Sequence, residues 1–346
     1  MSRRALTLLL ASVLALALTA AAVGTPVPYV ALGPGPVFNT TGEVDGEPVI
    51  EISGQRTFPT DGQLDLTTVG VDPRLTLLEA LRGWFDRDLA VVPRDVVYPP
   101  DKTDEQVDEE NAQSMVRSQN SAVTAAARQL GLDTTVVLTV GKVGKGSPSQ
   151  GRLRAGDRLL TVDGAAVADA DALRSAVRAA GVGQVVRIGY TRAGGAAATA
   201  QITTGASPED ATRPVIGIEP AEEPADLPFE VDITLEDVGG PSAGLMFALG
   251  ILDKLGEGSL TGGKHIAGTG EISSDGTVGP IGGITQKLIA ADAEGAVAFL
   301  VPKANCAEAV LRPPAGLVLI EVATLENALA DLATLRSGGT PTLCSA

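Results

Sequence analysis

Two residues of the chain, Ser242 and Lys287, have the side-chain types and settings that nucleophilic catalysis requires. Ser242 follows two glycines and a proline and opens an apolar run, 243–255, that predicts a helix. A serine at a helix N-terminus lies beside unpaired backbone N–H groups and the positive end of the helix dipole. Acyl transfer needs its nucleophile in such a place, because Oγ attacks a carbonyl while backbone donors hold the developing charge.

Lys287 lies 45 residues further on, in a second run with helical spacing. The apolar residues Ile284, Leu288 and Ala291 stand at i−3, i+1 and i+4 from it. This spacing turns the ammonium toward packed surface, where desolvation lowers the pKa of the amine and a neutral lysine can act as a base. Each feature alone also fits a structural role: a serine N-cap, a surface lysine with a packed stem, and glycines in turns.

The sole histidine, His265, is the rival base. It follows the turn-like Thr261-Gly-Gly-Lys264 and leads into an expected strand. A Ser–His–Asp triad would also need an orienting carboxylate, which the sequence does not identify. The glycine-rich stretch 258–264 is similar to a phosphate-binding loop but lacks the following Ser or Thr for Mg²⁺. We interpret it as a connection.

Three motifs occur in a fixed order: Gly240-Pro-Ser-Ala-Gly244, Thr269-Gly-Glu-Ile272, and Pro280-Ile-Gly-Gly283 followed by Lys287. Together they resemble the Lon-type serine proteases, which use a Ser–Lys dyad. The resemblance implies that Ser242 is the nucleophile, Lys287 the general base and Thr269 an auxiliary hydroxyl near the amine.

We expect the oxyanion to be held by N–H groups around Ser242, those of Gly240 or Ala243. No metal, nucleotide or other cofactor is implied. The best-known members of the family carry an ATPase module, for which this chain offers no candidate, so the resemblance implies ATP-independent proteolysis.

Composition limits the partners of the chain. Its 346 residues are enough for two domains with separate cores. The 26 basic and 42 acidic residues give a net charge of −16, which disfavours nucleic acid and anionic lipid. Since aromatic residues make up only 3%, the cores must be built from Val, Leu, Ile and Ala.

The N-terminus predicts a membrane anchor over residues 1–27. Arg3 and Arg4 precede 19 uncharged, mostly apolar residues, 5–23, which as a helix would span about 28 Å. Basic residues on the N-terminal side alone predict a single-pass protein of the cell membrane with its catalytic part extracytoplasmic. The alternatives are a signal peptide cleaved near Ala20-Ala21-Ala22 and, less well supported, a buried helix.

Residues 131–205 predict a separate unit with strands at 135–140 and 185–192 and a helix at 170–180. Gly146-Ser-Pro148, Leu153-Arg-Ala-Gly-Asp157 and Val162-Asp-Gly164 resemble a PDZ domain of exported bacterial proteases. Such domains bind a peptide at a sheet edge and hold its C-terminal carboxylate on backbone N–H groups, for which Gly131 and Leu132 are our candidates. The alternative is a small sheet domain without a ligand.

The remaining segments resemble two parts of one Lon-type proteolytic domain, 28–130 and 206–340, with the PDZ unit inserted between them. The first part predicts a strand at 64–69 and a long helix at 104–130. The second predicts strands at 229–235, 296–302 and 316–322 and a terminal helix at 325–335. The expected fold class is α+β, and the whole resembles the membrane-anchored, PDZ-containing Lon-like proteases of bacteria.

Cys306 and Cys344 are the only cysteines. In an exported domain an even pair suggests a disulfide, which would connect the C-terminal tail to the helix expected at 306, but two free thiols remain an alternative.

These observations favour a membrane-tethered serine endopeptidase that cleaves polypeptides outside the cytoplasmic membrane and recognises peptides through its PDZ domain. The alternative is a non-catalytic, membrane-tethered adaptor that binds peptides. Lon-type domains generally form rings, so the resemblance also implies a homo-oligomer.

Overall fold

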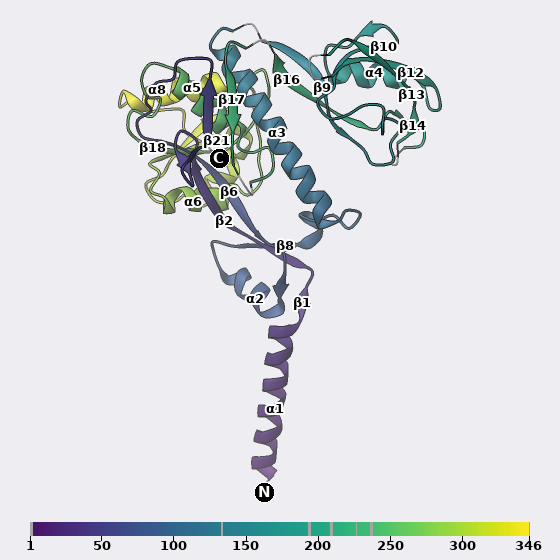
Figure 1. Ribbon diagram of the computed structural model, residues 1–346. Coiled ribbons are helices and arrows are strands. Elements are labelled where there is room, and N and C mark those ends of the chain that lie inside the picture. The colour runs from purple at the N-terminus through teal and green to yellow at the C-terminus, as the bar shows by residue number, and fades with distance from the viewer. Residues whose placement is uncertain are drawn as a thin grey trace.

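The computed structural model describes residues 3–132, 134–192, 195–207, 210–225, 227–235 and 238–345. Figure 1 shows a main body built on one mixed sheet, a smaller unit to its side, and an N-terminal helix that extends away from both. The long helix α3 (Asp104–Gln129) runs along the main body on the side that faces the smaller unit.

The main body is organised around a sheet with strand order β22-β21-β18-β6-β2-β8. Its strands are β22 (Val318–Val322), β21 (Ala298–Pro302), β18 (His265–Gly268), β6 (Gln63–Asp72), β2 (Tyr29–Asn39) and β8 (Ala90–Pro93). The first four are parallel, whereas β2 runs antiparallel to both of its neighbours. The parallel strand β21 is buried at every residue because both faces of the sheet are covered, which explains its continuous apolar sequence.

Helices cover both faces of this sheet. On one face α3, α5 (Gly244–Leu255) and α8 (Leu325–Arg336) enclose a core that contains Met246 and Phe247. On the other face α6 (Ile284–Ala293) and α7 (Cys306–Ala309) pack on Ala267, Phe299 and Val301. Because successive strand residues point to opposite faces, Ile266 lies in the first core and its neighbour Ala267 in the second.

The segments before and after the smaller unit build one body. β6 from the first segment lies beside β18 from the second, with Leu66 opposite Gly268. A second contact between them is the antiparallel pair β5 (Ile50–Ser53) and β17 (Glu230–Ile233). The smaller unit is therefore inserted between two parts of the main body.

The smaller unit is a sheet with strand order β13-β12-β10-β9-β16 and the helix α4 (Ala170–Ala180). Its strands are β9 (Thr135–Val143), β10 (Arg158–Val162), β12 (Val185–Thr191), β13 (Ala198–Thr203) and β16 (Ile218–Ala225). Leu138, Leu159, Ile188 and Ile202 are among the residues of its separate core. Since β16 pairs with β9 along its length, the unit extends past the boundary expected at residue 205.

Short elements complete the chain. Beside β2 lies the amphipathic α2 (Leu77–Phe85), whose capping box joins Thr76 and Glu79. The other strands are β1 (Pro26–Val27), β3 (Glu43–Val44), β4 (Glu47–Pro48), β7 (Leu75–Thr76), β11 (Ala165–Ala166), β14 (Gly205–Ala206), β15 (Pro214–Val215), β19 (Glu271–Ile272) and β20 (Val278–Gly279). Single 3₁₀ turns occur at Arg94–Val96 and Lys303–Asn305.

The N-terminal segment forms the helix α1 (Arg3–Gly24). Across the residues that the structure describes, no helix combines the length and the apolar character needed to cross a membrane. This finding contradicts our prediction of a transmembrane anchor in a single-pass membrane protein.

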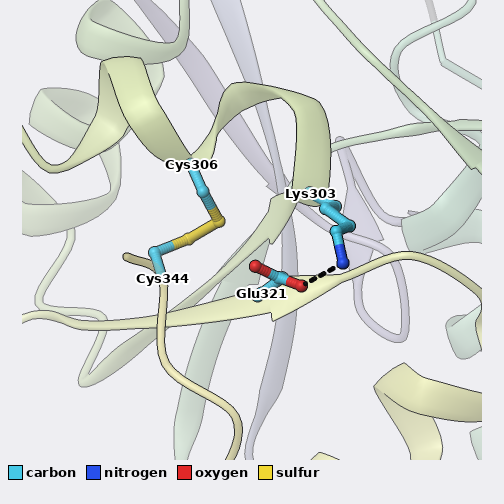
Figure 2. Close-up of a disulfide and its surroundings, with 4 residues drawn as sticks. All are labelled: Lys303, Cys306, Glu321 and Cys344. Atoms are coloured by element: carbon cyan, nitrogen blue, oxygen red, sulfur yellow. Dashed lines mark ion pairs between the residues drawn. A yellow bond between two sulfur atoms is a disulfide. The ribbon is translucent and has the colours of Figure 1, made fainter. Parts of the chain in front are cut away.

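A disulfide joins Cys306 at the start of α7 to Cys344 in the C-terminal tail, as Figure 2 shows. The tail lies along the outer edge of β22, where Glu321 N–H donates to Thr342 and Cys344 N–H donates to Leu319. The tail thus pairs with backbone groups that this edge strand would otherwise expose. The same strand carries Glu321, whose carboxylate forms an ion pair with Lys303 at 3.1 Å (Figure 2).

Candidate active site

Ser242 lies immediately before α5, whose first helical residue is Gly244 and whose N-cap is Ala243. The apolar residues of α5 bury it against the sheet and α3, and this packing fixes the position of the helix start. At Gly244 a Cβ atom would lie 2.7 Å from both Ile272 and the Ser118 hydroxyl. Glycine is required there because the helix start approaches its neighbours so closely.

Lys287 lies on α6 with its side chain 2% exposed. As the spacing predicted, Ile284, Leu288 and Ala291 are buried around it. Its Nζ lies 2.8 Å from Ser242 Oγ and 2.8 Å from Thr269 Oγ1. The structure therefore brings together the three residues that the motifs singled out.

Thr269 directly follows β18, so the central parallel strand delivers its hydroxyl to the site. This hydroxyl donates to the main-chain carbonyl of Ser242 at 3.0 Å. The Gly270 N–H donates to the same carbonyl at 2.8 Å. These two bonds fix the backbone of the serine relative to the sheet.

Burial controls the charge of the lysine amine. It lowers the pKa of Lys287 from its ordinary value to about 7, because the charged form loses its hydration. Within the described part of the chain no carboxylate forms an ion pair with Lys287 that would restore the charged form. A large fraction of the amine is therefore neutral near pH 7.

A cleft of about 1000 Å³ opens at Ser242 and Lys287. Its apolar lining includes Val69, Met115 and Val238, contributed by β6, α3 and the segment before the serine. Thr67 and Thr68 of β6 also line it. Such a cleft can hold an extended chain against Ser242.

The two N–H groups that we expected to hold the oxyanion differ in whether they already donate to a backbone acceptor. The Gly240 N–H donates to the Asn111 carbonyl at 2.8 Å, so it is already used and our expectation for this residue is wrong. For the Ala243 N–H, no backbone acceptor is present among the described residues. Since Ala243 is also the N-cap of α5, it remains the candidate donor.

His265 is not part of this group. It lies at the start of β18, four residues before Thr269, a distance of about 13 Å along an extended strand. Its Nε2 contacts the buried carboxylate of Asp65 on β6, the partner that the sequence did not reveal. His265 and Asp65 correspond to the base and the carboxylate of a Ser–His–Asp triad. However, the group that lies within hydrogen-bonding distance of Ser242 Oγ is the amine of Lys287.

Gly131 and Leu132 do not form the expected carboxylate site. They terminate α3, where the Gly131 N–H donates to Arg128 and the Leu132 N–H donates to Ala127. Both donors are consumed by the helix end, in the manner of a glycine cap with positive φ. The expectation failed because a glycine after a helix has the same appearance in sequence whether it caps the helix or binds a ligand.

Sequence reasoning missed two residues of α3 that touch the segment preceding the nucleophile. Ser118 Oγ donates to the Pro241 carbonyl at 2.8 Å, and Asn111 accepts from Gly240 as described above. The available signal was Ser118, a small polar residue on an otherwise buried helix face. A buried hydroxyl needs a hydrogen-bond partner, so this position indicates a contact with another segment.

Two segments of the chain match known protein families. Residues 236–328 match the Lon protease (S16) C-terminal proteolytic domain, and residues 111–204 match a PDZ domain. Lon protease 2 of Bacillus subtilis is 32% identical over 117 residues, 34% of this chain and 20% of that protein. A Lon protease of Roseiflexus castenholzii is 44% identical over 66 residues, 19% of this chain and 8% of that protein.

Part of the chain is also similar to a solved structure. The PDZ domain of the SdrC-like protein from Listeria monocytogenes is 27% identical, with 23% of this chain and 83% of that chain covered and a TM-score of 0.22. The chain spans a fifth or less of the length of the two curated relatives above. One segment of this chain is thus similar to a Lon-type proteolytic domain and another to a PDZ domain.

Proposed function

We propose that this chain is a serine endopeptidase that hydrolyses peptide bonds of proteins with a Ser242–Lys287 dyad and without ATP. The observation that carries the proposal is a buried lysine amine 2.8 Å from a serine hydroxyl at the start of a helix. The low pKa of that amine, about 7, supplies the neutral base that the reaction needs.

Acylation follows from this geometry. Neutral Lys287 takes the proton of Ser242 Oγ as the oxygen attacks the substrate carbonyl, and the Ala243 N–H stabilises the oxyanion. The resulting lysine ammonium then gives its proton to the leaving amine, so that the new N-terminus departs and an acyl ester remains on Ser242.

Deacylation repeats these steps with water. Lys287, neutral again, takes a proton from a water that attacks the ester, and the same proton returns to Ser242 Oγ when the acid product leaves. Thr269 holds the amine between these steps, since its Oγ1 lies 2.8 Å from Nζ. No metal or nucleotide takes part.

The role of the smaller unit is peptide recognition in this proposal. Its PDZ similarity and the two edge strands of its sheet, β13 and β16, support binding of an extended polypeptide by strand addition. We further propose that the protein acts as a homo-oligomer, on the basis of its Lon-type domain.

The test compares Ser242→Ala and Lys287→Ala with the unmodified protein on an unstructured protein substrate, with and without ATP. We expect cleavage by the unmodified protein at equal rates in both conditions, and a loss of at least about 10³-fold in each variant. Circular dichroism must show that the variants are folded. If the unmodified protein binds the substrate but never cleaves it, the chain is an adaptor and the proposal is wrong.

A further inference from the structure

The helix α3 contacts both the segment that precedes Ser242 and the smaller unit. Toward the active site it contacts the nucleophile loop, which we define as residues 238–243. The Asn111 carbonyl accepts the Gly240 N–H, and Ser118 Oγ donates to the Pro241 carbonyl, each at 2.8 Å. These bonds fix the two residues directly before Ser242.

The contact between α3 and the nucleophile loop is close as well as polar. At Gly239 a Cβ atom would lie 2.9 Å from the Cβ of Asn111, so the loop can rest on the helix only without a side chain there. Asn111 and Ser118 are seven residues apart, which places them on one face of the helix. Ser118 is 4% exposed, so its hydroxyl cannot exchange its partner for water without rearrangement.

Another face of α3 contacts the smaller unit. Glu109, Gln113 and Arg117 stand four residues apart and form one row on the helix. Glu109 pairs with Lys142 of β9 at 2.8 Å, and Arg117 lies 3.9 Å from Glu219 of β16. We call these five residues the α3 seam.

Gln113 joins the two ion pairs of the α3 seam. In the amide orientation that satisfies its neighbours, its nitrogen donates to Glu219 and its oxygen accepts from Lys142. Lys142 and Glu219 are also directly opposite each other on β9 and β16. The seam is therefore a connected network between α3 and the strands β9 and β16. These are the two strands that connect the smaller unit to the main body (Figure 1).

We propose that the PDZ unit positions the nucleophile loop through α3, with the α3 seam as the contact that transmits its position. The inference rests on the proposed function, because the loop matters only if Ser242 reacts. A helix moves as a rigid element, so a displacement of its outer face also displaces Asn111 and Ser118. The 2.8 Å contact between Ser242 and Lys287 is sensitive to shifts below 1 Å.

The strength of the α3 seam suits a contact that can open. The four charged side chains are between 30% and 55% exposed, so salt screens them and each pair stabilises the docked arrangement only weakly. Release of the seam, for example when a polypeptide binds the PDZ unit, would loosen the loop and slow acylation.

The experiment removes the seam from each side in the full chain. Glu109→Ala/Gln113→Ala/Arg117→Ala removes the seam side chains of the helix, and alanine is used because it has the highest helix propensity. Lys142→Ala/Glu219→Ala removes the seam side chains of the PDZ unit. We expect each variant to lower kcat about two- to tenfold on an unstructured substrate with KM unchanged. Combining all five substitutions should lower kcat no further, because both sets remove the same contact.

The matched control is Glu110→Ala. It breaks an ion pair of the same helix, with Lys102, at the position next to the seam residue Glu109. We expect its kcat to equal that of the unmodified protein. If the seam variants instead raise KM with kcat unchanged, the PDZ unit only recruits substrate and the proposal is overturned.

A second measurement does not depend on cleavage. The Gly240 amide is held by Asn111, and its hydrogen exchange should become two- to tenfold faster in both seam variants but not in Glu110→Ala. Unchanged exchange together with unchanged kcat would overturn the proposal while leaving the peptidase assignment intact. Faster exchange in a protein that never cleaves would support the positioning by α3 and contradict the proposed function.

Discussion

The Thr269 hydroxyl donates its hydrogen to the main-chain carbonyl of Ser242 at 3.0 Å. A hydroxyl has one hydrogen, so toward Lys287, 2.8 Å away, Oγ1 acts as an acceptor. One N–H of the amine is thereby directed to the threonine. When the amine is neutral, its lone pair can then face Ser242 Oγ, which is the orientation that proton transfer requires.

Replacing Thr269 tests this orientation. In Thr269→Val the shape is retained but the acceptor is lost, and we expect kcat to fall about 10- to 100-fold, the effect of one buried hydrogen bond. Thr269→Ser keeps the hydroxyl and should stay within about threefold of the unmodified protein. Steady-state kinetics on a fluorogenic peptide measure both. A valine variant with full activity would show that the threonine does not direct the amine.

The pH dependence of the reaction follows from the pKa of Lys287, about 7. Below this value the amine is protonated and cannot accept the serine proton. We expect kcat/KM to rise about tenfold per pH unit up to pH 7 and to level off above pH 8. Lys287→Arg should be inactive at every pH, since a guanidinium does not deprotonate. A profile that is flat from pH 5.5 to 8 would contradict lysine as the base.

The central residues of the site could be predicted from sequence because their setting is local. The apolar spacing around Lys287 and the glycines and proline before Ser242 are features of single helices and their starts. What could not be predicted were bonds to distant backbone. Gly240 was an expected oxyanion donor, yet its N–H is used by Asn111, which lies 129 residues earlier and on another helix.

In the fold, too, local features could be predicted and long-range pairing could not. Several helices and strands of the main body, among them β6, α3, α5, β21, β22 and α8, were predicted within a few residues, because their apolar patterns are strong. The edge of the smaller unit was not, since β16 contains Pro220 and Pro224 and follows a break in the apolar pattern. Its membership of that sheet depends on pairing with β9 across about 80 residues, which composition does not reveal.

Burial of Lys287 should also make the free energy of unfolding depend on pH. The folded pKa of about 7 lies below the unfolded value near 10.4, so the unfolded state binds more protons between these two pH values. Stability of the unmodified protein should therefore rise with pH, by about 1–3 kcal/mol from pH 7 to 9, relative to Lys287→Met. Urea unfolding at both pH values measures this difference. Parallel pH dependence of the two proteins would show that the amine is not held neutral.

The disulfide should stabilise the main body through the C-terminal tail. It closes a separation of 38 residues between Cys306 and Cys344, for which chain entropy predicts about 4 kcal/mol. We expect Cys306→Ser/Cys344→Ser to lose about 2–4 kcal/mol in denaturant unfolding and to expose the Glu321 amide to faster hydrogen exchange. Treatment of the unmodified protein with a reductant should have the same effect. Equal stability of both forms would mean that packing alone holds the tail.

His265 and Asp65 should matter for folding and not for catalysis. Asp65 is 4% exposed, and its pKa is raised by burial, with one carboxylate oxygen facing His265 and the other lacking a side-chain or backbone partner among the described residues. His265→Ala leaves this carboxyl buried and unpaired, which should cost about 1–3 kcal/mol.

The double variant Asp65→Ala/His265→Ala removes both polar groups, so it should lose less stability than the two single effects added together. Among the described residues, neither side chain forms a hydrogen bond or ion pair with Ser242 or Lys287. We therefore expect kcat of folded His265→Ala to remain within about twofold of the unmodified protein. Kinetics at a temperature well below unfolding separate the two effects. A fall in kcat of more than 100-fold with the fold intact would instead assign His265 to the chemistry and revive the triad that its pairing with Asp65 resembles.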